Sequence, residues 1–206
     1  AEKGNLLSAP DTYMEKIVVG ADLPLNLLDL DNSIQKNINL LAEAKNKKVS
    51  ELNACLLNRP RHKKIIDVLN EMKVNINFIT DGDIAGALSV VGDNPKNDIY
   101  LGTGGGPEGV IAAAALSCYG GQIQGRLVLD KDEITRAKKL GIQDTKKKYN
   151  IEDMAQGDII FSGTGVTDND LVKGIVVSKN NFVVNTLALH KSLNIKKNII
   201  NVHKKW

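Results

Sequence analysis

The segment that most constrains this 206-residue chain is residues 97–121, NDIYLGTGGGPEGVIAAAALSCYGG. Residues 99–101 carry the branched and aromatic side chains that favour a β-strand. The three consecutive glycines that follow predict a loop whose backbone amides can approach a ligand closely. Pro107 suits the first turn of a helix, and the apolar run 110–116 predicts that this helix is buried on most sides. A strand, a glycine loop and a helix start together form a typical anion-binding arrangement.

Glu108 lies in the first turn of this predicted helix. An acidic side chain there stabilises a helix by about 0.3–1 kcal/mol without any ligand. Alternatively, Glu108 binds a divalent metal ion, whose charge lets a carboxylate and a phosphate share one pocket. The glycines also match the dinucleotide-binding pattern G-x-G-x-x-G. A nucleotide-binding domain is nevertheless the least favoured interpretation, because Glu108 would repel the pyrophosphate and no Gly-Lys-Ser/Thr follows.

Composition excludes several classes of protein. The net charge is +3, the lysines are scattered and only 4% of residues are aromatic, which argues against nucleic-acid binding. No apolar run reaches membrane length, and no signal peptide is visible. Cys55 and Cys118 have apolar neighbours and no C-x-x-C spacing, so we expect a cytoplasmic protein. The three histidines are too far apart for a zinc-like spacing.

Strands and helices are expected to alternate through the middle of the chain. The expected strands are 52–57, 74–80, 99–101 and 122–129, and the expected helices between them are 60–72, 84–91 and the one that follows the glycines. This alternation predicts an α/β fold with a mostly parallel sheet and covering helices.

Further elements are expected on either side of this region. Strands are expected at 13–19 and 25–30, and Ser33 is expected to cap a helix that ends near residue 44. Residues 130–140 form an amphipathic helix, and Thr167 with Asp170 resembles a capping box. A β-rich tail is expected at 158–161, 175–177, 182–187 and 199–202, with a loop at 163–165. We predict a single α/β unit over residues 1–206.

Two polar motifs lie where predicted strands end, which is where ligands bind in parallel sheets. In Arg59-Pro60-Arg61-His62, three basic side chains at a helix start favour binding of an anion such as phosphate, although solvated side chains are the alternative. In Asp81-Gly82-Asp83, two carboxylates can accept sugar hydroxyls or hold a metal, or simply cap the next helix. Together with residues 103–108, these motifs predict one shared pocket.

The motifs resemble those of the class II (GlpX-type) fructose-1,6-bisphosphatases. The resemblance rests on RPRH at 59–62, DGD at 81–83, GTGGGPEGVIAAAAL at 102–116, AEKGNLLSAPDTYMEKIVVG at the start, GGQIQGRL at 120–127 and FSGTGVTDNDLVKG at 161–174. It implies a metal-dependent sugar-bisphosphatase of the inositol-phosphatase-like fold, which hydrolyses the 1-phosphate of fructose 1,6-bisphosphate in gluconeogenesis and is linked to glycerol metabolism. We also expect a homo-oligomer, or association with a missing N-terminal half.

The resemblance also implies roles for individual residues. Glu108 would bind Mn²⁺ or Mg²⁺, and no catalytic residue is assigned. The residues implied in substrate contact are Tyr13, Arg59, Pro60, Arg61, Asp81, Gly82, Asp83 and Gly105. The family carries its other metal-binding acids in segments resembling G-E-G-E and D-P-L-E-G-T, which this sequence lacks. We therefore expect the substrate-binding half of the enzyme, without its N-terminal metal-binding half and catalytically incomplete alone. The alternative is a non-catalytic sugar-phosphate-binding module or subunit.

Overall fold

The computed structural model describes residues 1–169 and 171–205 and is built around a five-stranded sheet of order β3-β2-β4-β1-β5. The strands are β1 (Tyr13–Val19), β2 (Asn53–Leu57), β3 (Asn75–Ile79), β4 (Ile99–Gly105) and β5 (Gln122–Val128). β2 pairs in parallel with β3 and β4, whereas β1 pairs antiparallel with β4 and β5. Four strands therefore run in one direction. This confirms a mostly parallel sheet, but β1 lies reversed in its middle, which the alternation did not predict.

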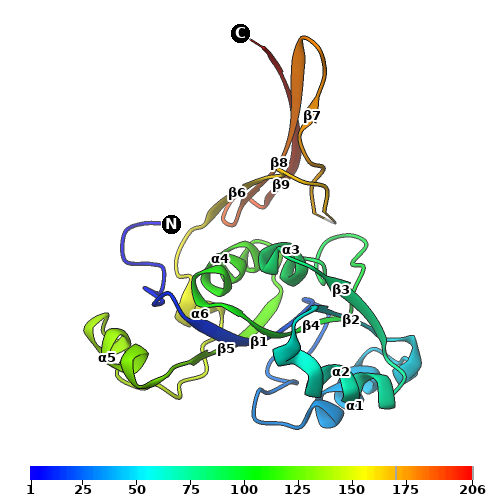
Figure 1. Ribbon diagram of the computed structural model, residues 1–206, viewed down its shortest axis with the longest axis vertical. Helices are drawn as coiled ribbons and strands as arrows, with labels where there is room; N and C mark the ends of the chain where they lie inside the picture. Colours follow the sequence, from blue (N-terminus) through cyan, green and yellow to red (C-terminus); the bar gives the residue numbers. More distant parts are fainter. Residues whose placement is uncertain (170, 206) are drawn as a thin grey trace.

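Helices cover both faces of this sheet (Figure 1). One face carries α1 (Ile34–Ala44), α2 (Lys63–Glu71) and the short 3₁₀ turns η1 (Val49–Glu51) and η2 (Pro60–His62). The other face carries α3 (Asp83–Leu88), α4 (Gly106–Ser117) and α6 (Ile151–Met154). Helix α5 (Lys131–Lys139) lies at the periphery. β1 contributes to both layers because strand side chains alternate. Met14 and Val18 pack in the cluster that includes α4, and Ile17 and Val19 pack in the cluster that includes α1.

A second, antiparallel sheet forms the C-terminal part of the chain. It contains β6 (Ile160–Thr164), β7 (Val176–Val177), β8 (Asn181–His190) and β9 (Ile195–Lys204), and β8 pairs with each of the other three strands. β7 and the adjoining ends of β8 and β9 project from the body as an arm (Figure 1). The tail is β-rich as predicted, but Gly163 belongs to β6 and not to a loop, because it pairs with Leu187 of β8.

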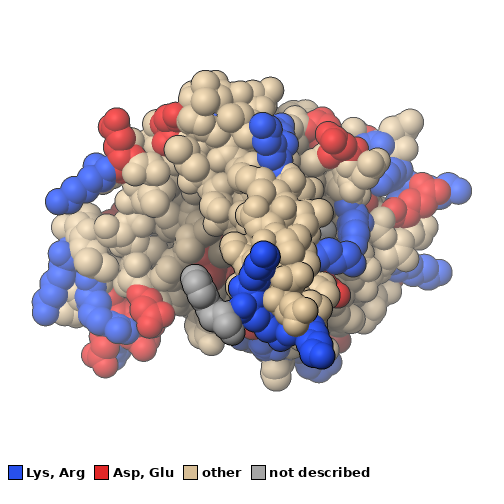
Figure 2. All heavy atoms as spheres, turned by 90° about the horizontal axis from the view of Figure 1, so that it is seen from above, with Lys and Arg blue, Asp and Glu red and all other residues tan. Residues whose placement is uncertain are grey.

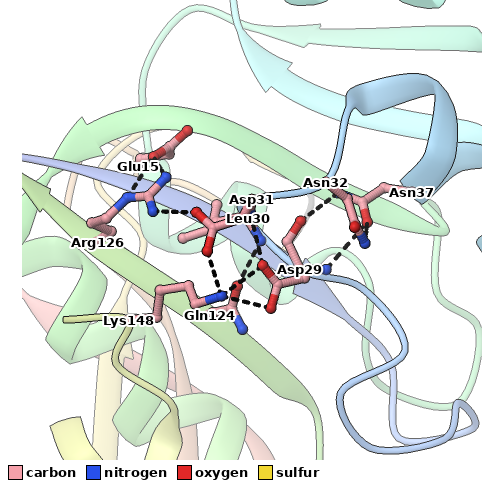
Figure 3. Close-up of polar contacts among 9 residues, drawn as sticks. All are labelled: Glu15, Asp29, Leu30, Asp31, Asn32, Asn37, Gln124, Arg126 and Lys148. Carbon is pink, nitrogen blue, oxygen red and sulfur yellow. Dashed lines mark hydrogen bonds and ion pairs between the residues drawn. The ribbon is translucent and has the colours of Figure 1, made fainter. Parts of the chain in front are cut away.

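Other local predictions need correction. Residues 25–30 form turns and not a strand, because side chains satisfy their backbone: Leu30 N–H donates to Gln124 and Asp29 N–H donates to Asn37 (Figure 3). Helix α6 was not expected; Asn150 caps it by accepting from the backbone of Asp153. The proposed capping box at 167–170 includes Asp170, which lies outside the described residues. None of the helices in the described part of the chain combines the length and the apolar character that a membrane-spanning segment requires.

Candidate functional site

Strand β4 leads directly into helix α4, so the predicted three-glycine loop does not exist. The strand ends at Gly105 and the helix begins at Gly106, whose N–H donates to Thr12 O over 2.7 Å. Gly105 has ordinary dihedral angles, φ −60° and ψ 141°. The glycines instead make room for side chains. A Cβ on Gly104 would overlap the carboxylate of Asp83, and a Cβ on Gly105 would overlap that of Glu108.

A pocket of about 580 Å³ lies at this junction. Of the nine residues assigned to substrate or metal from the sequence, eight line it: Tyr13, Arg59, Arg61, Asp81, Gly82, Asp83, Gly105 and Glu108. Pro60, the exposed first residue of η2, is not among the lining residues. The three segments expected to converge, residues 59–62, 81–83 and 103–108, therefore each contribute to one pocket, and the ligand roles of these residues stay predictions.

Sequence reasoning missed three polar residues of the lining, which are Asp11, Thr12 and Glu133. The first two precede β1 and reach the pocket because the start of β1 pairs with the end of β4. That pairing joins residues about ninety positions apart, so no local pattern reveals it. Glu133 lies in the first turn of α5, where its side chain accepts a hydrogen bond from the Asp130 backbone N–H. The D-x-x-E spacing signals this capping role but not the pocket.

Arg61 is held against the rim of the pocket by two contacts. Its guanidinium carbon lies 4.7 Å from the centre of the Tyr13 ring, and its Nε donates to Thr103 O over 2.9 Å. Arg59 donates to Asn58 O over 3.2 Å. Cation–π stacking limits the motion of a guanidinium while leaving its in-plane N–H groups able to bind an anion.

His62 is not available to a ligand, which corrects the expectation of three basic groups facing an anion. Its ring is 1% exposed and bridges two strands. Nδ1 lies 2.7 Å from Leu57 O, and Thr103 N–H donates to Nε2 over 2.8 Å. Nε2 also lies 3.1 Å from Thr103 O, so the backbone occupies both ring nitrogens. Its role is to join the ends of β2 and β4.

The two aspartates beside Gly82 have different surroundings. Asp81 is exposed and accepts a hydrogen bond from Gly82 N–H over 2.9 Å. The side chain of Asp83 is 9% exposed; it forms an ion pair with Lys16 and accepts a hydrogen bond from Tyr100 OH. Burial lowers the pKa of Lys16, although the Asp83 carboxylate acts in the opposite direction.

Glu108 is exposed in the first turn of α4, with its carboxylate packed against Gly105. The position suits a metal ligand, but the fit of the site to a metal ion is partial. Among residues 1–169 and 171–205, no group of three or more His, Cys, Asp or Glu side chains is placed to hold a metal ion. Glu108 therefore offers one carboxylate, and hard divalent ions need several oxygen ligands.

Comparisons with known proteins decide the family. A family model described as bacterial fructose-1,6-bisphosphatase, glpX-encoded, matches residues 1–203. This chain belongs to that family. Two relatives are each named D-fructose 1,6-bisphosphatase class 2/sedoheptulose 1,7-bisphosphatase. The relative from Trichodesmium erythraeum (strain IMS101) is 32% identical over 217 residues, which cover 98% of this chain and 63% of the relative. The relative from Synechococcus sp. (strain JA-3-3Ab) is 38% identical over 189 residues, covering 85% and 54%.

The chain thus spans between about half and two thirds of the length of these relatives. Members of the family are phosphatases that depend on divalent metal ions. The match along residues 1–203 includes all the motifs that converge at the pocket.

Proposed function

We propose that this chain forms the substrate-binding half of a class II fructose-1,6-bisphosphatase, which hydrolyses the 1-phosphate of fructose 1,6-bisphosphate in gluconeogenesis. The observation that carries the proposal is the pocket itself, in which two guanidinium groups and a row of carboxylates face one space at the start of α4. Because the relatives are also named sedoheptulose 1,7-bisphosphatases, we propose sedoheptulose 1,7-bisphosphate as a second substrate to test.

The proposed roles follow the chemistry of each group. Arg59 and Arg61 bind a phosphate, since a guanidinium offers a bidentate pair of donors. Asp81 accepts hydroxyl groups of the sugar, and Asp83 does so through lone pairs left free by its partners. Tyr13 packs beside the ligand, and Gly82 and Gly105 allow a close approach of the backbone. Pro60 acts indirectly, by starting η2 between the two arginines.

Glu108 is proposed as one ligand of a divalent cation, Mg²⁺ or Mn²⁺. The lining supports this, because five acidic residues against two arginines disfavour a bisphosphate unless a cation offsets their charge. When bound, such an ion activates water and stabilises the leaving oxygen. We propose that its remaining ligands come from outside residues 1–206, so that this chain alone is catalytically incomplete.

Phosphate release and calorimetry together test the proposal. The chain alone should bind fructose 1,6-bisphosphate and release little phosphate in excess Mn²⁺ or Mg²⁺. Addition of the segments of the Trichodesmium erythraeum relative that this chain does not match should restore release, and Glu108→Ala should abolish it. Failure to bind the sugar would overturn the proposal, and rapid turnover by the chain alone would overturn its metal site. Binding without restored release would favour a non-catalytic sugar-phosphate-binding module.

A cytoplasmic homo-oligomer is also proposed. Both cysteines are buried and form no disulfide, which agrees with a reducing compartment. The arm exposes apolar side chains such as Val176, Ile200 and Val202, each at least 60% exposed. Much of the middle of the surface seen from the arm side is uncharged (Figure 2). Light scattering should give a mass of two or more times 22.3 kDa. A monomer would instead favour the alternative, in which a segment that carries the other metal ligands covers the arm.

A further inference from the structure

Lys16 is a buried charged residue that sequence reasoning did not assign to the site. It lies on β1 between Met14 and Val18, on the face of the sheet that packs against α4, and is only 2% exposed. Gly109 of α4 lies so close that an added Cβ would come within 3.4 Å of the Lys16 side chain. Burying an ammonium group is costly unless it is paired and hydrogen-bonded. Lys16 therefore has to be understood together with its partners.

Those partners are two components of the pocket wall. Lys16 Nζ donates to Asp83 Oδ2 and, over 2.9 Å, to Gly105 O. The other oxygen of Asp83 accepts a hydrogen bond from Tyr100 OH. The same carboxylate packs on Gly104, where a Cβ would overlap it. Asp83 is thus held in one orientation, with its remaining surface turned to the pocket.

The charge of the pocket also depends on Lys16. The lining carries five carboxylates and two guanidinium groups: Asp11, Asp81, Asp83, Glu108 and Glu133 against Arg59 and Arg61. Lys16 lies behind this lining and offsets one carboxylate. Repulsion between a carboxylate and a phosphate is several times stronger near a protein surface than in bulk water. Without Lys16, Asp83 would oppose any phosphate bound beside it.

We infer that Lys16 is a positioning residue of the sugar-phosphate site, which fixes the Asp83 carboxylate and cancels its charge so that an anionic ligand can bind. The inference rests on the function proposed above. Lys16 acts through Asp83 and does not touch the ligand. The competing explanation is purely structural, in which the ion pair only ties β1 to α3.

Calorimetric binding of fructose 1,6-bisphosphate to the full chain separates these explanations. Lys16→Met keeps the length of the side chain and removes its charge, and it should weaken binding roughly tenfold or more at pH 8. In the double variant Lys16→Met/Asp83→Asn no charge remains to be offset, and replacing both partners is far less costly than removing one. The double variant should therefore fold and bind as well as Asp83→Asn alone.

The pH profile is the measurement that a structural role would not change. In Lys16→Met, Asp83 takes up a proton more readily as pH falls, so affinity relative to the native chain should recover from pH 8 towards pH 5. Charged or titratable groups that act on Lys16, contact Asp83 or line the pocket beside it include Glu108, Arg61, Tyr100 and Asp81, and they are the same in all variants. The double variant should show no such recovery.

Lys45→Met is the matched control. Lys45 is also largely buried and pairs with Asp22 over 2.8 Å, but it does not line the pocket. It should lower stability and leave affinity and the pH profile unchanged. The inference would be overturned if the affinity losses of the two single variants multiplied in the double variant. It would also be overturned if the affinity of Lys16→Met relative to the native chain did not change with pH. A native chain that binds no sugar bisphosphate would overturn the proposed function and this inference with it, so the two failures are distinguishable.

Discussion

The guanidinium carbon of Arg61 lies 4.7 Å from the centre of the Tyr13 ring, so an arginine from η2 stacks on a tyrosine from the start of β1. The two residues are 48 positions apart in the sequence, and both line the pocket. Stacking limits the motion of the guanidinium at the pocket, where its remaining N–H groups can bind a phosphate. The geometry links two motifs that the sequence presents separately.

We expect Arg61→Ala to weaken binding of fructose 1,6-bisphosphate by about 1.5–3 kcal/mol, the usual cost of losing a hydrogen bond to a charged group. Calorimetry at low salt measures this change. The control is Lys64→Ala, which removes an equal charge from an exposed position of α2 that does not line the pocket. Equal and small losses in the two variants would contradict the assignment of Arg61 to phosphate.

We expect His62→Ala to lower the free energy of unfolding by about 2–4 kcal/mol, because it leaves a cavity and two unpaired backbone groups. Those groups are Leu57 O and Thr103 N–H. Urea unfolding monitored by circular dichroism measures the effect. His203→Ala is the comparison, since His203 is exposed and stacks on Phe182 with ring centres 4.9 Å apart. A loss no larger than that of His203→Ala would show that His62 is not needed to join the strands.

Local patterns predicted much of this fold because they reflect local physics. Ser33 does cap α1, since its side chain accepts from Lys36 N–H. The span predicted for β1, residues 13–19, is the span observed. Both signals depend on neighbours within a few residues. The position of β1 between β4 and β5 depends on pairing across the whole unit, which a single sequence does not encode locally.

The candidate site, too, contains residues that the sequence could predict and residues that it could not. The arginine and aspartate motifs could be found because they follow strands, and strand ends of a parallel sheet share one edge. The ion pair of Lys16 with Asp83 could not be found by that rule. One signal was present: Lys16 shares a strand face with Met14 and Val18, so a lysine occupies the face that alternation assigns to the core. A charged residue on such a face indicates a buried partner.

We expect the cluster in Figure 3 to make stability sensitive to acid. Lys148 Nζ lies 2.7 Å from oxygens of both Asp29 and Asp31, and this hydrogen bonding lowers the pKa of each carboxyl group below its ordinary value of 3.8. A lowered pKa in the folded state contributes stability above about pH 4, which is lost as pH falls through the folded value. Lys148→Met should reduce stability at pH 6 and converge with the native chain near pH 2.

Urea midpoints from pH 6 to pH 2 measure this dependence. Lys36→Met is the control, because Lys36 is exposed on α1. This substitution should leave the loss of stability at low pH unchanged. In 1 M salt the difference between Lys148→Met and the native chain should shrink, since these groups are close to solvent. Parallel curves for the native chain and Lys148→Met over the whole range would mean that the ion pairs do not form in solution.

We expect Gly105→Ala to fold normally and yet to disturb Glu108. The dihedral angles of Gly105 are ordinary for alanine, so the backbone itself does not require glycine. The added Cβ would overlap the Glu108 carboxylate, which must move away. If Glu108 binds a divalent ion together with the added segments that supply its other ligands, Gly105→Ala should, in the presence of those segments, reduce the increase in fructose 1,6-bisphosphate affinity caused by Mg²⁺ about as much as Glu108→Ala does. Calorimetry with and without Mg²⁺ measures that increase, and thermal unfolding verifies the fold.

The double variant Gly105→Ala/Glu108→Ala separates an effect through Glu108 from a direct clash with the ligand. When Glu108 is absent, the extra methyl group meets no carboxylate, so the double variant should resemble Glu108→Ala alone. A further loss in the double variant would instead mean that the methyl group occupies space that the sugar phosphate needs. Gly105 would then be a substrate contact in its own right, and the glycine would be required by the ligand and not by the position of Glu108.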